Sequence, residues 1–297
     1  SFQNKKELIE NYNAFSLNRK YKYDHYILRG ANDKLQKIIN LLRAHDIEFG
    51  HVAKEGVANA WSFDSQSQET LKYTTSDLVV STNQPKGPMV EVLFEPQTYL
   101  SDSLTYDITA WSLPYAYGLD AHGFKGDLEV SDNWSQSFER NPMPNCYAYL
   151  CKWNSMNSAA FLQSILSQNI AVKVAEKQFQ IEDEVFPVGT LVIPRGINKD
   201  ITEFDEILQG AAKDSWIDIH PVASGYVSKG KDFGSSSYNE IFLPQVGVLS
   251  GGDLSPLNTG EIWHFFEKEL ALPFRMFRVS ELDRIDELEL IVLPSGP

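Results

Sequence analysis

Only two cysteines occur in the 297 residues, Cys146 and Cys151, and they do not form the CxxC spacing of a redox motif or a metal finger. If the run between them is a strand, positions five apart face opposite sides of it and lie about 16 Å apart. A disulfide needs Cα atoms roughly 4.4–6.8 Å apart. We therefore predict two buried free thiols.

Long apolar runs are also absent. A membrane-spanning helix needs about 18 consecutive apolar residues, whereas the best run, LELIVLP at 288–294, has the length of a strand. Basic residues are outnumbered, 26 against 40 acidic ones, which gives a net charge of −14. Without a stripe of Lys and Arg, this balance argues against nucleic acid and anionic membranes as partners.

The start of the chain, SFQNKKELIENY, has no initiator Met and no signal sequence. At the other end, the chain stops directly after the strand-like run LIVLP. Both ends predict that the chain is a fragment of a longer protein.

Motifs of nucleotide binding and nucleophilic catalysis are missing as well. The glycines Gly251, Gly252 and Gly260 lack both the GK[ST] of a phosphate loop and the GxGxxG spacing of a dinucleotide site. No GxSxG or GxCxG sequence provides a nucleophile elbow. We predict no catalytic residue in this chain.

Two His-x-x-Glu pairs exist, His45 with Glu48 and His264 with Glu267. A zinc hydrolase needs three protein ligands and an open water position, and no histidine follows the second pair. A histidine at the end of a helix, where His45 lies, is a common structural feature. We predict that both pairs are structural and that the chain holds no metal.

An internal repeat is present in the chain. Residues 23–54 align without a gap with residues 146–177, at an offset of 123, and the hydrophobic pattern recurs although few residues are identical. Each copy predicts a strand, a polar loop, a helix and a second strand. A further apolar strand follows each copy, DLVVSTNQ at 77–84 and GTLVIPRG at 189–196. This alternation predicts an α/β fold with parallel or mixed sheets, of the flavodoxin-like kind.

The helices of the two copies are predicted from apolar spacing. Leu35, Ile38, Ile39 and Leu42 fall at i, i+3, i+4 and i+7, and the second copy nearly repeats this spacing. The predicted N-terminal caps, whose side chains accept hydrogen bonds from the first turn, are Asn32 or Asp33 in the first helix and Asn157 or Ser158 in the second.

Residues 85–145 form a different, aromatic-rich region between the two copies. Its first part, PKGPMVEVLFEP, predicts a turn and a strand that pairs with DLVVSTNQ as a hairpin. The aromatic and acidic residues that follow are typical either of a groove for glycans or peptides or of rings that pack a loop-rich region. The ligand-binding candidates of this region are Asp107, Trp111, Tyr115 and Tyr117.

A third α/β unit occupies residues 241–297. The strand VGVLSGG precedes the helix GEIWHFFEKEL, for which Asn258 and Glu261 predict a capping box. Two more strands follow, in FRMFRV and LELIVLPSG. We place a domain boundary at about residue 240, so that residues 1–240 hold the two repeat units, at about 23–84 and 146–198, and the insertion at 85–145.

Several phrases together resemble the region downstream of the peptidase domain in large bacterial zinc carboxypeptidases of the carboxypeptidase A type. They are QPKGPMVEVLFEP, DSLTYDITAWSLPYAYGL, GTLVIPRGINKD, KDFGSSSYNE and VGVLSGGDLSPLNTGEIWHFFEKEL, with DITAWSLPYAYG the most specific. The third unit is similar to the start of a class I glutamine amidotransferase-like fold. This resemblance implies a secreted or periplasmic parent with zinc in a peptidase domain that precedes this chain.

Three functions remain as hypotheses. The first is a non-catalytic accessory region that packs against the parent's peptidase domain or presents substrate to it. The second is a glycan- or peptide-binding module that uses the aromatic residues around Trp111. The third is a fragment of an amidotransferase-like enzyme, and the missing elbow argues against it.

Overall fold

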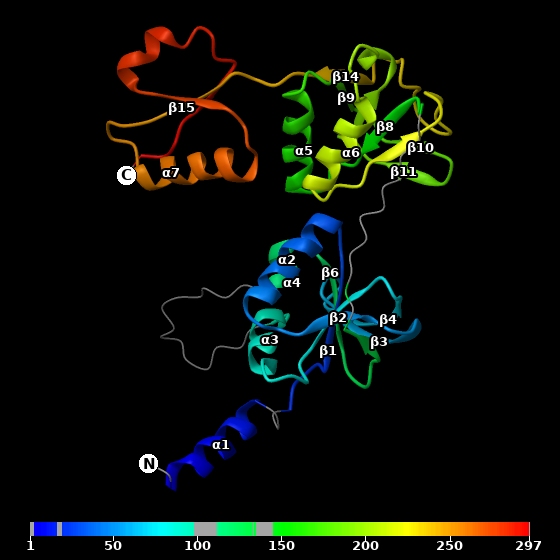
Figure 1. The fold of residues 1–297 in the computed structure, drawn as a ribbon, viewed down its shortest axis with the longest axis vertical. Helices are drawn as coiled ribbons and strands as arrows, with labels where there is room; N and C mark the ends of the chain where they lie inside the picture. The colour runs from blue at the N-terminus through cyan, green and yellow to red at the C-terminus, as the bar shows by residue number, and fades with distance from the viewer. Residues whose placement is uncertain (1–2, 17–19, 98–111, 133, 135–144, 297) are drawn as a thin grey trace. The chain divides into compact units, whose positions relative to one another are not determined.

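The structure is a computed structural model, which describes residues 3–16, 20–97, 112–132, 134 and 145–296 (Figure 1). The chain divides into two compact units, residues 1–137 and 138–297, and each is described by itself. None of the described helices is long and apolar enough to cross a membrane.

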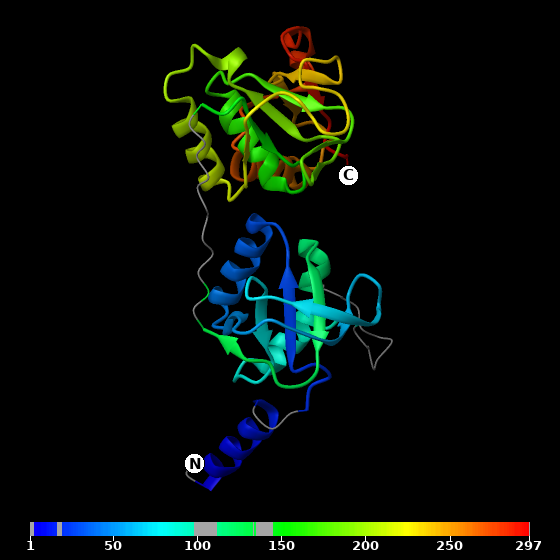
Figure 2. The same cartoon turned by 90° about the vertical axis from the view of Figure 1, so that its right-hand side faces the viewer.

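The first unit begins with helix α1 (Gln3–Ser16) and contains a seven-stranded sheet, the first sheet, in the order β4-β3-β6-β1-β5-β2-β7. Its strands are β1 (His25–Arg29), β2 (Phe49–Val52), β3 (Gly56–Ser62), β4 (Ser67–Tyr73), β5 (Leu78–Ser81), β6 (Asp120–Phe124) and β7 (Val130–Ser131). Its further helices are α2 (Asn32–Ala44), α3 (Gly87–Phe94) and α4 (Leu113–Tyr117). In Figure 2, the blue strand β1 runs through the middle of this sheet, beside the green strand β6.

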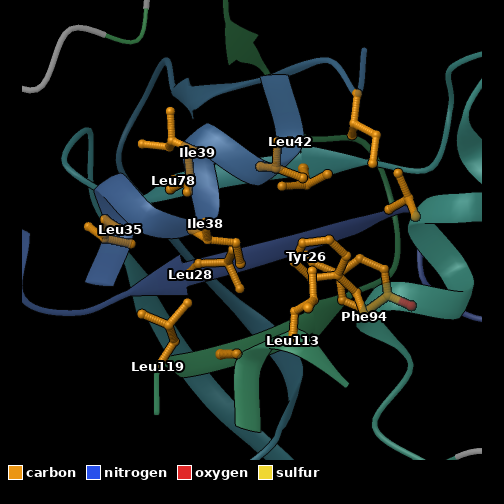
Figure 3. Packing of buried hydrophobic residues seen from close by; sticks show 14 of the residues in the cluster. Tyr26, Leu28, Leu35, Ile38, Ile39, Leu42, Leu78, Phe94, Leu113 and Leu119 are labelled. Carbon is orange, nitrogen blue, oxygen red and sulfur yellow. The ribbon is translucent and has the colours of Figure 1, made fainter. Parts of the chain in front are cut away.

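The main core of this unit lies between the sheet and its helices. Leu35, Ile38, Ile39 and Leu42 of α2 are at most 6% exposed, and Figure 3 shows them above Leu28 of β1. The predicted helix is thus confirmed, and its apolar stripe is buried as the spacing requires. A second apolar cluster, on the opposite face, includes Ile27, Val79 and Phe124 and is covered by the hairpin β3–β4, the first hairpin.

The second unit contains a five-stranded sheet, the second sheet, in the order β13-β8-β12-β9-β14. Its strands are β8 (Ala148–Cys151), β9 (Val172–Ala175), β12 (Leu191–Pro194), β13 (His220–Val222) and β14 (Tyr238–Ile241). Helix α5 (Met156–Leu166) follows β8, while the 3-10 turn η1 (Gly196–Asn198) and helix α6 (Phe204–Asp214) follow β12. The second hairpin, β10 (Phe179–Ile181) and β11 (Glu184–Phe186), forms a small sheet of its own.

The two sheets share one topology and one pairing register. The offset of 123 places β1, α2 and β2 on β8, α5 and β9, while β5, β6 and β7 correspond to β12, β13 and β14 at offsets of 113, 98 and 108. Thus His25 pairs with Ser81 in the first sheet, and Ala148 pairs with Pro194 in the second. Each sheet has the βαββαβ order of a split βαβ, or ferredoxin-like, arrangement, with a hairpin inserted after its second strand and one more strand at its end.

A buried side-chain amide closes the same loop in both sheets. Gln84 accepts a hydrogen bond from Glu48 N and donates to Glu48 O and to the carbonyl of the last residue of β5. Asn198 accepts from Ala171 N and donates to Ala171 O and to the carbonyl of the last residue of β12. Each amide fixes the loop between a helix and its following strand to the end of the neighbouring strand.

The predicted α/β character is confirmed, but all strand pairs of the first two sheets are antiparallel. A helical crossover does join parallel strands, β1 to β2 and β8 to β9. However, β5 and β12 lie between them and run the opposite way. The alternation of strands and helices does not reveal which strand will fill that gap. The two repeats also lie in separate sheets.

The hairpin predicted from DLVVSTNQ and MVEVLFEP is wrong, because the second segment forms helix α3. Pro88 is at the start of this helix, where its fixed φ is favourable, and Val90 and Phe94, four residues apart, are buried. Gly87 is the first residue of this helix, and a Cβ there would lie 2.2 Å from Thr82 O, so a side chain does not fit at this position. The alternation of apolar residues was compatible with a strand, but the burial follows the helical period.

The predicted helix caps are also wrong. Helix α2 starts at Asn32 and has Ala31 at its N-cap, while α5 starts at Met156 and has Ser155 at its N-cap. The residues predicted as caps, Asn32 or Asp33 and Asn157 or Ser158, therefore belong to the first turns.

The third sheet is parallel, in the order β16-β15-β17, and consists of β15 (Val246–Leu249), β16 (Phe274–Phe277) and β17 (Leu290–Val292). Helix α7 (Pro256–His264) continues into the π-helical turn η2 (Phe265–Glu269), and the 3-10 helix η3 (Val279–Arg284) follows β16. The N-cap of α7 is Ser255, whose side chain accepts from Asn258 N, so the helix begins before the predicted box of Asn258 and Glu261. Glu240 lies within β14 of the second sheet, and the next strand, β15, belongs to the third sheet. The domain boundary at about residue 240 stays a prediction.

Candidate functional site

The aromatic candidates from the sequence lie partly outside the described residues, as Asp107 and Trp111 do. Tyr115 and Tyr117 are on α4. The hydroxyl of Tyr115 donates to Phe63 O at 3.0 Å, and its ring lies 5.3 Å from that of Phe63. Tyr117 packs against the main core of the first unit. Both described tyrosines thus make packing contacts, and the aromatic groove stays a prediction.

The two His-x-x-Glu pairs have local contacts. His45 follows the last residue of α2. Glu267 accepts a hydrogen bond from Trp263 Nε1 and lies 3.1 Å from Lys268 Nζ. The hydrogen bonds from Lys268 and Trp263 lower the pKa of Glu267. Within the described ranges, no group of three or more His, Cys, Asp or Glu residues could hold a metal ion.

Both cysteines are free and buried, as predicted. They pack in the same core cluster, because Cys146 precedes β8 instead of belonging to it. Next to Cys146, Arg195 donates to Cys146 O at 2.9 Å and to Asp205 at 2.5 Å. Asp205 also accepts from the hydroxyl of Tyr149 at 2.7 Å, and burial, followed by this hydrogen bond, raises the pKa of Tyr149.

The most informative polar contact of the first sheet is made by His122 on β6. This residue lies opposite Ile27, on the face covered by the first hairpin. Its Nε2 is 2.9 Å from Oε1 of Glu69 on β4, and its side chain is only 5% exposed. The hydrogen bond with His122 lowers the pKa of Glu69. A histidine on the sheet and a glutamate on the hairpin therefore hold this end of the first sheet closed.

The second sheet has the same pair in an open form. His220 lies opposite Leu150, at the position equivalent to His122, and its Nδ1 is 3.6 Å from Oε2 of Glu184 on β11. The side chain of His220 is 37% exposed. Lys152 places Nζ 2.7 Å from Oε1 of Glu184 and 5.2 Å from the centre of the Phe186 ring.

The lysine at this site differs from its equivalent in the first sheet. Arg29, the equivalent of Lys152, pairs with Asp77 at 2.6 Å. Thr190 replaces Asp77 in the second sheet, at the offset of 113. Lys152 instead pairs with Glu184 of the second hairpin, so the ammonium group of Lys152 lies on the side of the sheet that this hairpin faces.

The hairpins explain why one site is closed and the other open. In the first sheet, β3 pairs directly with β6, and Ser62 lies opposite His122. In the second, β10 bonds instead to a loop, because Gln180 N donates to Lys229 O at 2.8 Å and Ser228 N donates to Gln180 O at 2.7 Å. The second hairpin therefore packs against β13 through Phe186 and His220 without pairing with it as a strand.

A pocket of about 690 Å³ lies between the second hairpin and β13, and we name it the β13 pocket. Its lining includes Glu182, Asp183, Glu184, His220, Pro221 and Tyr226. Three neighbouring carboxylates give it a negative wall, and the Tyr226 ring, in a residue that is 71% exposed, provides an aromatic face. Pockets of this volume hold small molecules or side chains of a partner.

A second pocket, of about 750 Å³, lies in the first unit, where β1 begins and β5 and β6 end. Lys125 places Nζ 2.7 Å from Asp24 there. Burial raises the pKa of Asp24, but the hydrogen bonds from Lys125 and Gly126 outweigh it, so that the pKa is lowered. This pocket carries charges of both signs, Lys20 and Lys125 with Asp24 and Asp127, and therefore lacks the one-sided negative wall of the β13 pocket.

The histidine pair was missed in the sequence, although a signal exists. Asp120-Ala-His122 and Asp218-Ile-His220 share a D-x-H pattern at an offset of 98. Insertions change the offset from 123 to 98 along the chain, so a gap-free alignment does not reach the pattern. No family model, curated protein or solved structure matches the chain.

Proposed function

We propose that the chain is a non-catalytic accessory region of a zinc carboxypeptidase-like protein and that the β13 pocket is its ligand-binding site. One observation carries the site: the same position is closed by a strand and a His–Glu pair in the first sheet and open in the second. A fold that occurs twice and leaves one of two equivalent positions open is suited to binding at that position.

The contacts of the two equivalent histidines support a role other than catalysis. His122 is bound to Glu69 and almost fully buried, and His220 faces Glu184. Both pairs join a hairpin to a sheet, which is a structural role. The parent's class rests on the resemblance of the sequence phrases alone, and in this proposal peptide hydrolysis belongs to the parent's peptidase domain.

The non-catalytic part is tested on the purified chain by measuring bound zinc and the hydrolysis of a C-terminal reporter peptide. We expect neither stoichiometric zinc nor hydrolysis. One equivalent of tightly held zinc, or hydrolysis that a chelator abolishes, would overturn this part of the proposal.

The site is tested by thermal unfolding against a panel of peptides and glycans, because a ligand that binds the folded state raises the unfolding temperature. Ala223→Trp fills the β13 pocket, and Ala53→Trp places the same ring at an exposed alanine elsewhere. We expect a ligand that stabilises the wild type and Ala53→Trp but not Ala223→Trp. If no member of the panel does so, the site is wrong.

A second candidate function is the start of an amidotransferase-like enzyme. The parallel order of the third sheet, in which the first strand lies between the second and third, supports it, since doubly wound folds share this order. The sequence that follows Pro297 in the gene tests this candidate. A Cys or Ser elbow there would favour it, and the lack of one would end it.

A further inference from the structure

The position of the β13 pocket in the second sheet corresponds to the position of strand β3 beside β6 in the first sheet. We infer that the pocket binds an extended peptide segment with a Lys or Arg side chain, and that this segment lies antiparallel to β13 as β3 lies along β6. The inference rests on the proposed binding site and names the class of its ligand. Peptide addition to a sheet edge is a common mode of recognition.

The first step is the position of β13. It is the last strand of the second sheet as described, β13-β8-β12-β9-β14. Its equivalent β6 is an inner strand, covered by β3 through the pairs of Ala60 with Phe124, Trp61 with Gly123 and Ser62 with His122. The second sheet as described thus ends where the first continues with two more strands, β3 and then β4.

The second step is the direction of the backbone groups. Phe63 N donates to Ala121 O at 3.0 Å, so Ala121 turns its backbone toward β3. Backbone direction alternates along a strand, and Gly123 therefore also faces β3. The equivalents of these two residues, at the offset of 98, are Ile219 and Pro221. Their backbone groups face the side on which a peptide would pair.

The third step concerns Pro221, which replaces Gly123. A Cβ on Gly123 would lie 2.8 Å from the ring of Tyr23, whereas the smaller Cys146 replaces Tyr23 in the second sheet and leaves room for proline. Proline offers a carbonyl but no N–H, and it protects an edge strand from pairing with further copies. The edge of β13 is therefore suited to a short pairing with one segment, not to open-ended sheet growth.

The fourth step is charge complementarity. The wall opposite β13 carries Glu182, Asp183 and Glu184, and Lys152 pairs with only the last of these. The carboxylates favour a cationic side chain, and the exposed ring of Tyr226 offers it a cation–π contact. A Lys or Arg on the bound segment satisfies both, which an acidic or neutral residue does not.

The test uses the full chain and a short capped peptide of alternating Thr and Val with a central Arg, titrated by fluorescence anisotropy. Citrulline in place of Arg removes the charge at nearly constant shape, and we expect it to weaken binding about fivefold. In an extended peptide, every second backbone N–H points toward β13 and the others point away from it. Two peptides are therefore compared, each methylated on the backbone nitrogens of one of these alternate sets of residues. We expect the affinity to fall about tenfold when the N–H groups that face β13 are methylated, and to change little when the others are.

Variants of the protein test the same contacts. Glu182→Gln with Asp183→Asn is expected to weaken binding about fivefold. The matched control, Glu55→Gln with Asp64→Asn, removes the same charge from exposed positions of the first unit and is expected to change nothing. Pro221→Val supplies the missing N–H and is expected to strengthen binding about threefold.

The outcomes separate this inference from the proposed site. Binding that ignores both methylation patterns, or that the Glu182 and Asp183 exchanges leave unchanged, would overturn the inference. If no such peptide binds while another ligand stabilises the wild type but not Ala223→Trp, the inference is wrong and the site stands. If no ligand of any class is blocked by Ala223→Trp, both are wrong.

Discussion

His122 on β6 and His220 on β13 are equivalent residues of the two sheets, and each faces a glutamate of its own hairpin. In the first sheet the contact is short and its histidine is buried, whereas in the second the contact is longer and its histidine is partly exposed. The same pair of residue types therefore closes one sheet edge and leaves the other accessible.

This difference predicts unequal costs for the same substitution. We expect His122→Ala to lower the free energy of unfolding by about 2 kcal/mol, because it removes a buried ring and the bond to Glu69. His220→Ala should cost less than about 1 kcal/mol, since its side chain is partly exposed. Urea denaturation of both variants measures this, and equal losses would contradict the structural difference.

The pKa of Glu69 predicts a change at acid pH. The hydrogen bond with His122 holds this pKa below its usual 4.5, so the carboxylate contributes stability above pH 4.5 that is lost as the pH falls through the lowered value. The difference in unfolding temperature between the wild type and Glu69→Gln should therefore shrink as the pH falls below 4.5. Glu55→Gln, at an exposed position, is the control and should show no such trend.

His25 predicts a second pH effect, at higher pH. Burial lowers the pKa of His25 from 6.5, and this effect outweighs the nearby charges of Asp24 and Asp127, which raise it. The Nδ1 atom of His25 is buried and has no hydrogen-bond partner among the described residues. The unfolded chain binds this proton more readily, so stability is full above pH 6.5 and falls as the pH drops toward the lowered value. We expect His25→Phe, whose ring can remain near Phe124, to flatten stability between about pH 7 and pH 5. Thermal melts across this range measure the slope, and an unchanged slope would be contrary evidence.

The two buried amides predict a matched pair of losses. Gln84→Glu and Asn198→Asp keep the shape but replace the amide donor with oxygen, which then faces two backbone carbonyls in each case. We expect each to cost about 2–3 kcal/mol, because buried carbonyls lose their partner. Asn40→Asp, on the exposed face of α2, serves as the control. Chemical denaturation measures the free energy of unfolding of all three variants. A loss below about 0.5 kcal/mol in the two buried variants would show that the hydrogen bonds of these amides contribute little to stability.

The first half of each repeat was readable from the sequence because it has no gap. The offset of 123 holds from β1 to β2, and it correctly placed the strands and the helices α2 and α5. The second half was readable only in part: the strands β5 and β12 were predicted, but the equivalence of the strands that follow them was not, since hairpins and loops of different lengths change the offset. Thus Gln84 and Asn198 perform the same task with different side chains and are not recognisable as equivalents.

The sheet order and the site depend on contacts between distant segments. The position of β5 between β1 and β2 is decided by packing, not by the alternation of apolar residues. The helical conformation of α3, which buries Val90 and Phe94, is also decided by packing. The aromatic residues around Trp111 are recognisable as candidates from composition. His220 and Glu184 are not, because they are distant in the sequence and only the fold brings them together.

Because its own hairpin is short and does not pair with β13, the second sheet can accept a strand from another molecule, and in our inference the bound peptide supplies that strand. The strands of the first hairpin have seven residues each and those of the second have three. Transplanting residues 56–73 in place of residues 179–186 would give the second sheet a tethered donor of its own. The result would be a self-blocked receptor, in which a tethered strand covers the edge of β13 and the carboxylates of the second hairpin are lost together with the ligand's access.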